Sequence, residues 1–145
     1  MLSFLKNVFG APCSNDDVPI HVPEIDGVKE EIAQGRPEYE GLMQKYQFFS
    51  KGEFIGSLET ELWSENKLLL VHRIDSKIPY QKQGTAMVNW LVDNTEEYIQ
   101  PVHVIGGGLG FWLQMRKLWP YRIIGRDLRC SDYLSLLEQR KANFQ

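Results

Sequence analysis

The chain has 145 residues, a length at which one domain around one buried core is the expected organisation. Hydrophobic residues make up 43% of the chain and charged residues 24%, as in a globular protein. The formal net charge of −3 disfavours non-specific nucleic-acid binding, and no apolar run is long enough to predict a transmembrane helix.

Cysteine usage favours a reducing compartment. Cys13 and Cys130 lack the spacing of a zinc site and are too few for a disulfide scaffold. We therefore expect a cytoplasmic protein without a bound metal. Cys130 has no histidine close by in the sequence, so a structural role is expected for it rather than a nucleophilic one.

Residues 1–27 are predicted to form an apolar segment followed by a loop. Residues 1–9 are apolar on one helical face, but Lys6 interrupts them and no small-residue cleavage site follows, so a signal peptide is not expected. Docking of this segment on its own domain is the expectation, and a partner or a membrane surface is the alternative. Residues 10–27 contain three prolines among polar residues, which favours a loop that can be flexible. A single domain is then expected over residues 28–145.

The first predicted elements of this domain are two short helices, over residues 28–34 and 37–43. An antiparallel hairpin is predicted next, because residues 45–50 and 53–63 are rich in β-formers and are joined by Lys51-Gly52.

Residues 67–76 form the predicted central strand, followed by a polar loop and by a helix over residues 85–98. Free N–H groups of such a loop and of the first helical turn point outward at the strand end, where the helix dipole adds positive charge. This arrangement binds phosphate. Gly84 lets the backbone approach an anion closely, and further donors are available on Gln81, Lys82, Gln83 and Thr85. The alternative is an ordinary turn that needs Gly84 only for its backbone angle.

The rest of the chain predicts another strand and helix, a last strand and a C-terminal helix. Residues 101–105 form the strand, residues 111–119 the helix, and residues 120–128 the last strand. The final helix covers residues 133–142, with Asp132 as its N-cap. The glycines after residue 105 lack the third glycine of a dinucleotide-binding motif, so that function is not expected.

The segment Gln81-Lys-Gln-Gly84-Thr-Ala86, between a hydrophobic strand and a helix, resembles the Gln/Arg-x-x-Gly-x-Gly/Ala signature of the GNAT superfamily of acyl-CoA N-acyltransferases. In that family the signature holds the pyrophosphate of coenzyme A. The resemblance covers roughly residues 46–126. It implies an α/β (α+β) fold with a single mixed sheet, in which an antiparallel hairpin precedes two splayed parallel strands flanked by helices. The pantetheine arm would lie between the splayed strands. The implied cofactor contacts are Ile74, Ser76, Gln81, Lys82, Gln83, Gly84, Thr85 and Ala86.

The resemblance implies transfer of an acetyl or other acyl group from acetyl-CoA to a primary amine of a small molecule or a protein. The acceptor amine must lose a proton, so the site needs a base. His72 on the central strand is the first candidate, because an imidazole pKa near 6.5 suits a base at neutral pH. Alternation places His72 on the same side of its strand as Leu70, Ile74 and Ser76. The alternative bases are Glu59, Glu61 and His103, and each of the four candidates can instead be structural.

GNAT enzymes commonly protonate the leaving thiolate with a tyrosine on the helix after the splayed strand, where this chain has Trp112 or Gln114. Tyr121 is our candidate for the acid, and Tyr133 is the alternative. The missing tyrosine favours a second hypothesis, a non-catalytic GNAT-fold protein that acts through binding or protein contacts. A third is a structural or regulatory protein whose glycine-rich turns bind nothing. Relatives in this superfamily often form homodimers, which leaves a homodimer as an open expectation.

Overall fold

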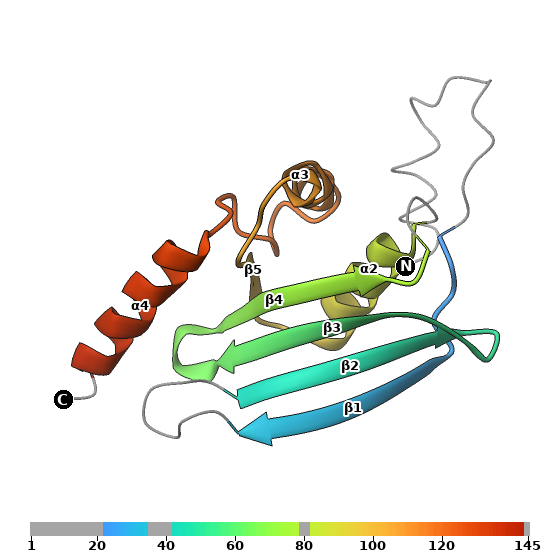
Figure 1. The fold of residues 1–145 in the computed structure, drawn as a ribbon, viewed down its shortest axis with the longest axis horizontal. Helices are drawn as coiled ribbons and strands as arrows, with labels where there is room; N and C mark the ends of the chain where they lie inside the picture. The colour runs from blue at the N-terminus through green and yellow to red at the C-terminus, as the bar shows by residue number, and fades with distance from the viewer. Residues whose placement is uncertain (1–21, 35–41, 79–81, 144–145) are drawn as a thin grey trace.

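The computed structural model describes residues 22–34, 42–78 and 82–143, which form one layered unit (Figure 1). Five strands lie in the order β1-β2-β3-β4-β5, and only β4 and β5 run parallel. The strands are β1 Gly27–Gln34, β2 Leu42–Ser50, β3 Glu53–Trp63, β4 Leu68–Ser76 and β5 Tyr98–Pro101. The helices are η1 Ser64–Asn66, α2 Gln83–Asn94, α3 Gly107–Leu118 and α4 Cys130–Asn143. The predicted α/β architecture with a mixed sheet is confirmed.

The hairpin of β2 and β3 is also confirmed. Lys51 and Gly52 both have positive φ, 52° and 77°, as a two-residue turn between twisted strands requires. The helix predicted over residues 28–34 is wrong, because these residues belong to β1, which pairs with β2 from Gly27↔Phe49 to Gln34↔Leu42. Pairing at a sheet edge outweighs the weak helix propensity of this segment. Of the second predicted helix, residues 37–41 lie outside the described residues, and Leu42 and Met43 belong to β2 instead.

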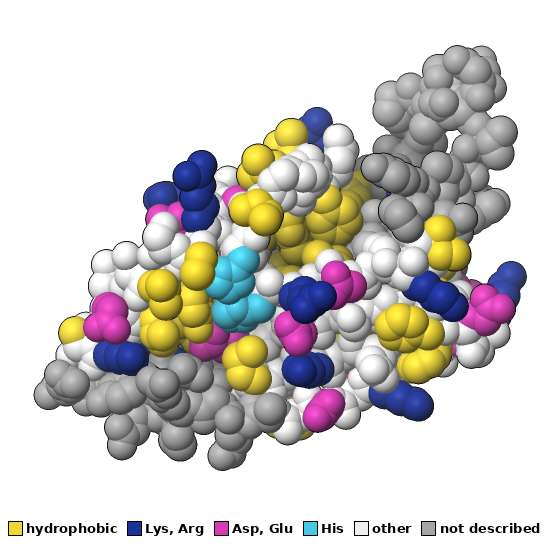
Figure 2. Space-filling model, viewed as in Figure 1, with side chains coloured by type: hydrophobic (Ala, Val, Ile, Leu, Met, Phe, Trp, Pro, Cys, Tyr) yellow, Lys and Arg dark blue, Asp and Glu magenta, His cyan; other side chains and the backbone are white. Residues whose placement is uncertain are grey.

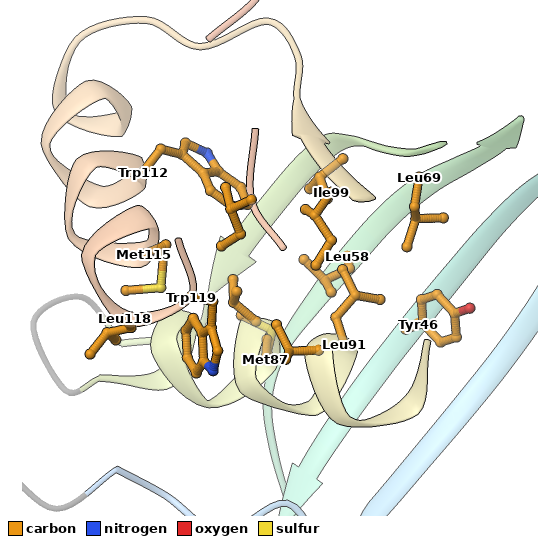
Figure 3. Close-up of a cluster of buried hydrophobic side chains, with 14 of the residues drawn as sticks. Tyr46, Leu58, Leu69, Met87, Leu91, Ile99, Trp112, Met115, Leu118 and Trp119 are labelled. Atoms are coloured by element: carbon orange, nitrogen blue, oxygen red, sulfur yellow. The ribbon is translucent and has the colours of Figure 1, made fainter. Parts of the chain in front are cut away.

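Two groups of buried side chains, one on each face of the sheet, hold the helices. The larger cluster joins α2 and α3 to one face through Leu58, Met87, Leu91, Ile99, Trp112 and Met115 among others (Figure 3). Gly56 lets α2 lie close to β3, since an added Cβ would be 2.7 Å from Met87 Cε. The smaller cluster joins α4 to the opposite face through Trp63, Leu70, Val102, Leu128 and Leu137. The two faces follow from strand alternation, which turns neighbouring side chains such as Leu69 and Leu70 to opposite sides.

The elements after α2 differ from the prediction in their bounds. α2 ends at Asn94, four residues before the predicted end, and the strand predicted over residues 101–105 is instead β5, which ends at Pro101. Proline lacks the N–H that a continuing ladder would need, so it sits at the strand end. Residues 120–128 form isolated bridges, Ile99↔Ile123 and Val102↔Leu128, rather than the predicted strand. α4 begins two residues before Asp132, whose carboxylate accepts the Arg129 N–H at 3.0 Å from within the first turn.

Candidate functional site

β4 and β5 separate part of the way along the sheet. They pair over four residues, from Leu68↔Tyr98 to Val71↔Pro101, and Val102 N–H still donates to Val71 O at 3.0 Å. Two residues later Val104 N–H donates to Leu128 O instead, at 3.2 Å. His103, between them, has a left-handed φ of 61°, an uncommon conformation for a residue with a side chain. Beyond Val71, that edge of β4 has no strand partner among the described residues. We call this separation the fork.

A β-bulge places His72 at the fork. Glu59 pairs with Arg73 and Thr60 pairs with Val71, so His72 is the extra residue of β4. The predicted alternation is therefore wrong beyond His72. Ile74 pairs with Leu58 and packs against the larger cluster, whereas His72 contacts residues on the opposite face.

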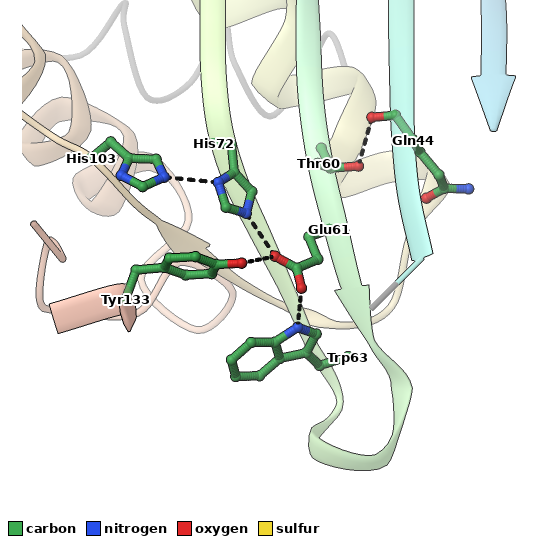
Figure 4. Close-up of polar contacts among 7 residues, drawn as sticks. All are labelled: Gln44, Thr60, Glu61, Trp63, His72, His103 and Tyr133. Carbon is green, nitrogen blue, oxygen red and sulfur yellow. Dashed lines mark hydrogen bonds and ion pairs between the residues drawn. The ribbon is translucent and has the colours of Figure 1, made fainter. Parts of the chain in front are cut away.

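Glu61 anchors a polar cluster on that face (Figure 4). Its side chain is fully buried and accepts hydrogen bonds from Trp63 Nε1 at 2.6 Å and from Tyr133 Oη at 2.8 Å. His72 Nε2 lies 2.8 Å from the same oxygen that Tyr133 contacts. A buried carboxylate needs such donors, because an ionised oxygen without them would be costly to take out of water.

His103 extends this cluster toward the fork. Its Nε2 lies 2.9 Å from His72 Nδ1, so carboxylate, first imidazole and second imidazole form one continuous chain (Figure 4). The Tyr133 ring packs against both imidazoles, with centroid separations of 4.8 Å to His72 and 5.5 Å to His103. We call Glu61, His72 and His103 the relay, and Tyr133 lies over it.

The surroundings of His103 favour its neutral form. Burial lowers the pKa of His103 below its ordinary value, and His72 lowers it further, while Glu61 raises it in part. A neutral imidazole has one nitrogen free to accept a proton. This property suits a base at neutral pH.

Two predicted catalytic residues lie away from the relay. Glu59 is half-buried and pairs with Lys45 at 3.4 Å on the sheet face. Tyr121 is 89% exposed just after α3 and contacts none of the relay residues. The structure instead brings together His72 and three residues that the sequence offered only as alternatives, namely Glu61, His103 and Tyr133.

In the described part of the predicted anion site, most side chains at the start of α2 are buried. Gln83 is buried and its Oε1 accepts the Ile78 N–H at 2.9 Å, and the side chains of Thr85 and Ala86 are buried as well. Lys82 is exposed, with a φ of 59°, while Gln81 lies outside the described residues. Ala86 N–H donates to Lys82 O, and the N-cap residue Lys82 makes no side-chain capping hydrogen bond to α2. The amides of residues 83–85 are the groups left to meet an anion.

Gly84 has a packing role too. A Cβ at this position would lie 2.9 Å from Phe111 Cε1 and 3.5 Å from Ser76 Oγ. The Phe111 ring of α3 therefore approaches the start of α2 and the C-terminal end of β4 at the same point. Gly84 is needed for this approach, whatever the loop binds.

The surface beside the relay is hollowed. Figure 2 shows the two described histidines next to a hollow floored by hydrophobic side chains, between α3 and β4. A separate depression of about 460 Å³ lies further along the sheet, with Lys45, Glu59, Arg73 and Asp75 in its lining. These four charges form the pairs Lys45–Glu59 and Arg73–Asp75, whereas the relay joins two imidazoles to a buried carboxylate, so the relay is the better candidate.

Within the described ranges, no group of three or more histidine, cysteine or acidic side chains is arranged to hold a metal ion. None of the described helices is long and apolar enough to cross a membrane. Comparisons with family models, curated proteins and solved structures found no match to this chain.

Proposed function

We propose that this protein is an acyl-CoA-dependent N-acyltransferase of the GNAT type, which transfers an acetyl or similar acyl group to a primary amine. The observation that carries the proposal is the fork, with the relay at its apex. The edge of β4 beyond Val71, which has no strand partner in the described part of the chain, has backbone groups that can pair with the amides of a pantetheine arm. The N-terminus of α2 follows the same strand end, so its amides can meet the pyrophosphate.

The relay supports the chemistry of this proposal. When an amine attacks the thioester carbonyl carbon, the C–N bond forms, the C–S bond breaks and one amine proton must leave. In this proposal the acceptor is His103 at the apex of the fork, whose pKa is lowered by burial, so that its neutral form is favoured. Solvent can protonate the departing thiolate, since α3 carries no tyrosine and Tyr133 is bonded to Glu61.

A second candidate is a GNAT-type protein that binds coenzyme A without turnover. It is favoured by Trp112, which is buried at the position where the resemblance expects an acidic tyrosine hydroxyl. Both candidates predict that acetyl-CoA raises the melting temperature. Only the first predicts release of free thiol when the protein, acetyl-CoA and a panel of small amines and peptides are combined.

The variant that tests the anion site is Lys82→Glu, because any side chain at Gly84 would also push on Phe111. A carboxylate at the α2 N-terminus should weaken coenzyme A binding by about tenfold, since it repels the pyrophosphate. Lys67→Glu is the matched control, because Lys67 is also exposed and left-handed, with a φ of 52°, but lies at the other end of β4. Equal affinities for the two variants, or no binding by the parent protein, would contradict the proposal.

A further inference from the structure

We propose that His103 is the proton acceptor of the site, through its Nδ1, and that Glu61 and His72 set its tautomer and take over the accepted charge. This inference rests on the proposed function for its substrate, but its structural part can be tested without any reaction.

The hydrogen bonds around Glu61 determine which nitrogen of His72 carries the proton. Trp63 Nε1 can only donate, and Tyr133 Oη and His72 Nε2 approach the same carboxylate. A carboxylate surrounded in this way accepts from all three groups when it is ionised. His72 must then carry its proton on Nε2.

The hydrogen bond between the two imidazoles then determines which nitrogen of His103 carries the proton. A neutral His72 protonated on Nε2 has a lone pair on Nδ1, which must accept from His103 Nε2–H at 2.9 Å. His103 is then left with a lone pair on Nδ1. Among the described residues, His103 has no other hydrogen-bond partner, and its side chain is half-buried. The pair of described histidines lies beside the hollow in Figure 2. The lone pair is thus available to a substrate.

Proton transfer in the reaction then follows these hydrogen bonds. The acceptor amine gives its proton to His103 Nδ1, and His103 passes the Nε2 proton to His72 Nδ1. The positive charge then lies on His72, 2.8 Å from Glu61 Oε1, where the buried carboxylate stabilises it. No atom moves except the two protons. His72 and Glu61 are positioning residues in this account, because only His103 contacts the substrate.

The groups that face the pair of imidazoles come from several elements. They are Glu61 of β3, Tyr133 of α4 and the two histidines themselves.

The test is the tautomer of each imidazole, read from long-range ¹⁵N–¹H spectra of the full chain above neutral pH. In the parent protein both His72 and His103 should be protonated on Nε2 and bare on Nδ1. In Glu61→Gln the amide can donate to His72 Nε2, so both rings should reverse to the Nδ1–H form. Signals are assigned by their loss in single histidine variants. A His103 that carries its proton on Nδ1 in the parent protein would overturn the proposal, whether or not Glu61→Gln folds.

The kinetic arm uses His103→Asn, because asparagine tolerates the left-handed backbone that His103 adopts. Thiol release should fall about 10²–10³-fold at pH 7, as expected for loss of a general base. Glu61→Gln should also flatten the rise of kcat/KM with pH, which a purely structural role would leave in place. Turnover that persists in His103→Asn would refute only the assignment of His103 as the base. Predicted tautomers without turnover on any amine would refute the proposed function and leave the hydrogen-bond assignment standing.

Discussion

At the scale of single residues, His103 combines three properties that seldom coincide. Its backbone is left-handed, its side chain is bonded to a second histidine, and its pKa is lowered chiefly by burial. An uncommon backbone conformation held by surrounding structure is often found where a side chain has to be aimed. Here this conformation turns the segment after β5 away from β4 and toward Leu128. It leaves the imidazole at the apex of the fork.

The lowered pKa of His103 predicts how stability depends on pH. The unfolded chain binds a proton at an ordinary histidine pKa of about 6.5, whereas the folded protein binds it only at lower pH. Between these two values the unfolded state holds more protons, so this contribution to stability is present above about pH 6.5 and lost as the pH falls. His103→Asn removes the effect.

Urea unfolding near pH 7.5 and pH 5.5 checks this prediction. The parent protein should lose more stability between the two pH values than His103→Asn does. Equal losses in both proteins would mean that the His103 pKa does not differ between the folded and unfolded states.

At the scale of elements, Arg122 holds the end of α2 in place. Its guanidinium donates to Val92 O and Thr95 O, each at 2.8 Å, and to Glu97 O at 3.1 Å. Val92 lies in the last turn of α2, and Thr95 and Glu97 follow the helix, so these carbonyls have no further helical N–H to accept from. Arg122 therefore joins the end of α2 to the segment that enters β5.

Arg122→Met should destabilise the fold by about 2–4 kcal/mol, because it leaves several half-buried carbonyls without a donor. Chemical denaturation measures the loss. Arg126→Met is the matched control, since Arg126 is exposed and reaches Asp132 only at 3.8 Å, and its effect should stay within about 0.5 kcal/mol. Similar losses for both variants would show that the Arg122 contacts contribute little.

The elements also show where sequence patterns are sufficient. The hairpin turn at Lys51-Gly52 and the apolar spacing of α2 were predictable, because their causes are local. β1 was not, because Gly27–Gln34 is a strand only through its pairing with β2. The bulge at His72 was not predictable either, since it appears only as a mismatch of register between β3 and β4.

At the scale of the whole molecule, the relay depends on contacts between distant parts of the chain. Tyr133 reaches Glu61 across 72 residues of sequence, and His103 reaches His72 across 31. The sequence offered all four residues as candidates but no reason to group them. One signal becomes visible once the parallel register is known. Val71 and Val102 share the last hydrogen bond between the β4 and β5 segments. The residue that follows each valine, His72 or His103, is a histidine at the fork.

The central claim is that the fork and the start of α2 form one binding surface for coenzyme A. It is tested most directly by titrating ¹⁵N-labelled protein with coenzyme A and following the backbone amides. We predict saturable shifts at residues 72–76 and 83–85 and near His103, with β1 and β2 unchanged. Shifts confined to other parts of the molecule, or no shifts at millimolar coenzyme A, would contradict the account.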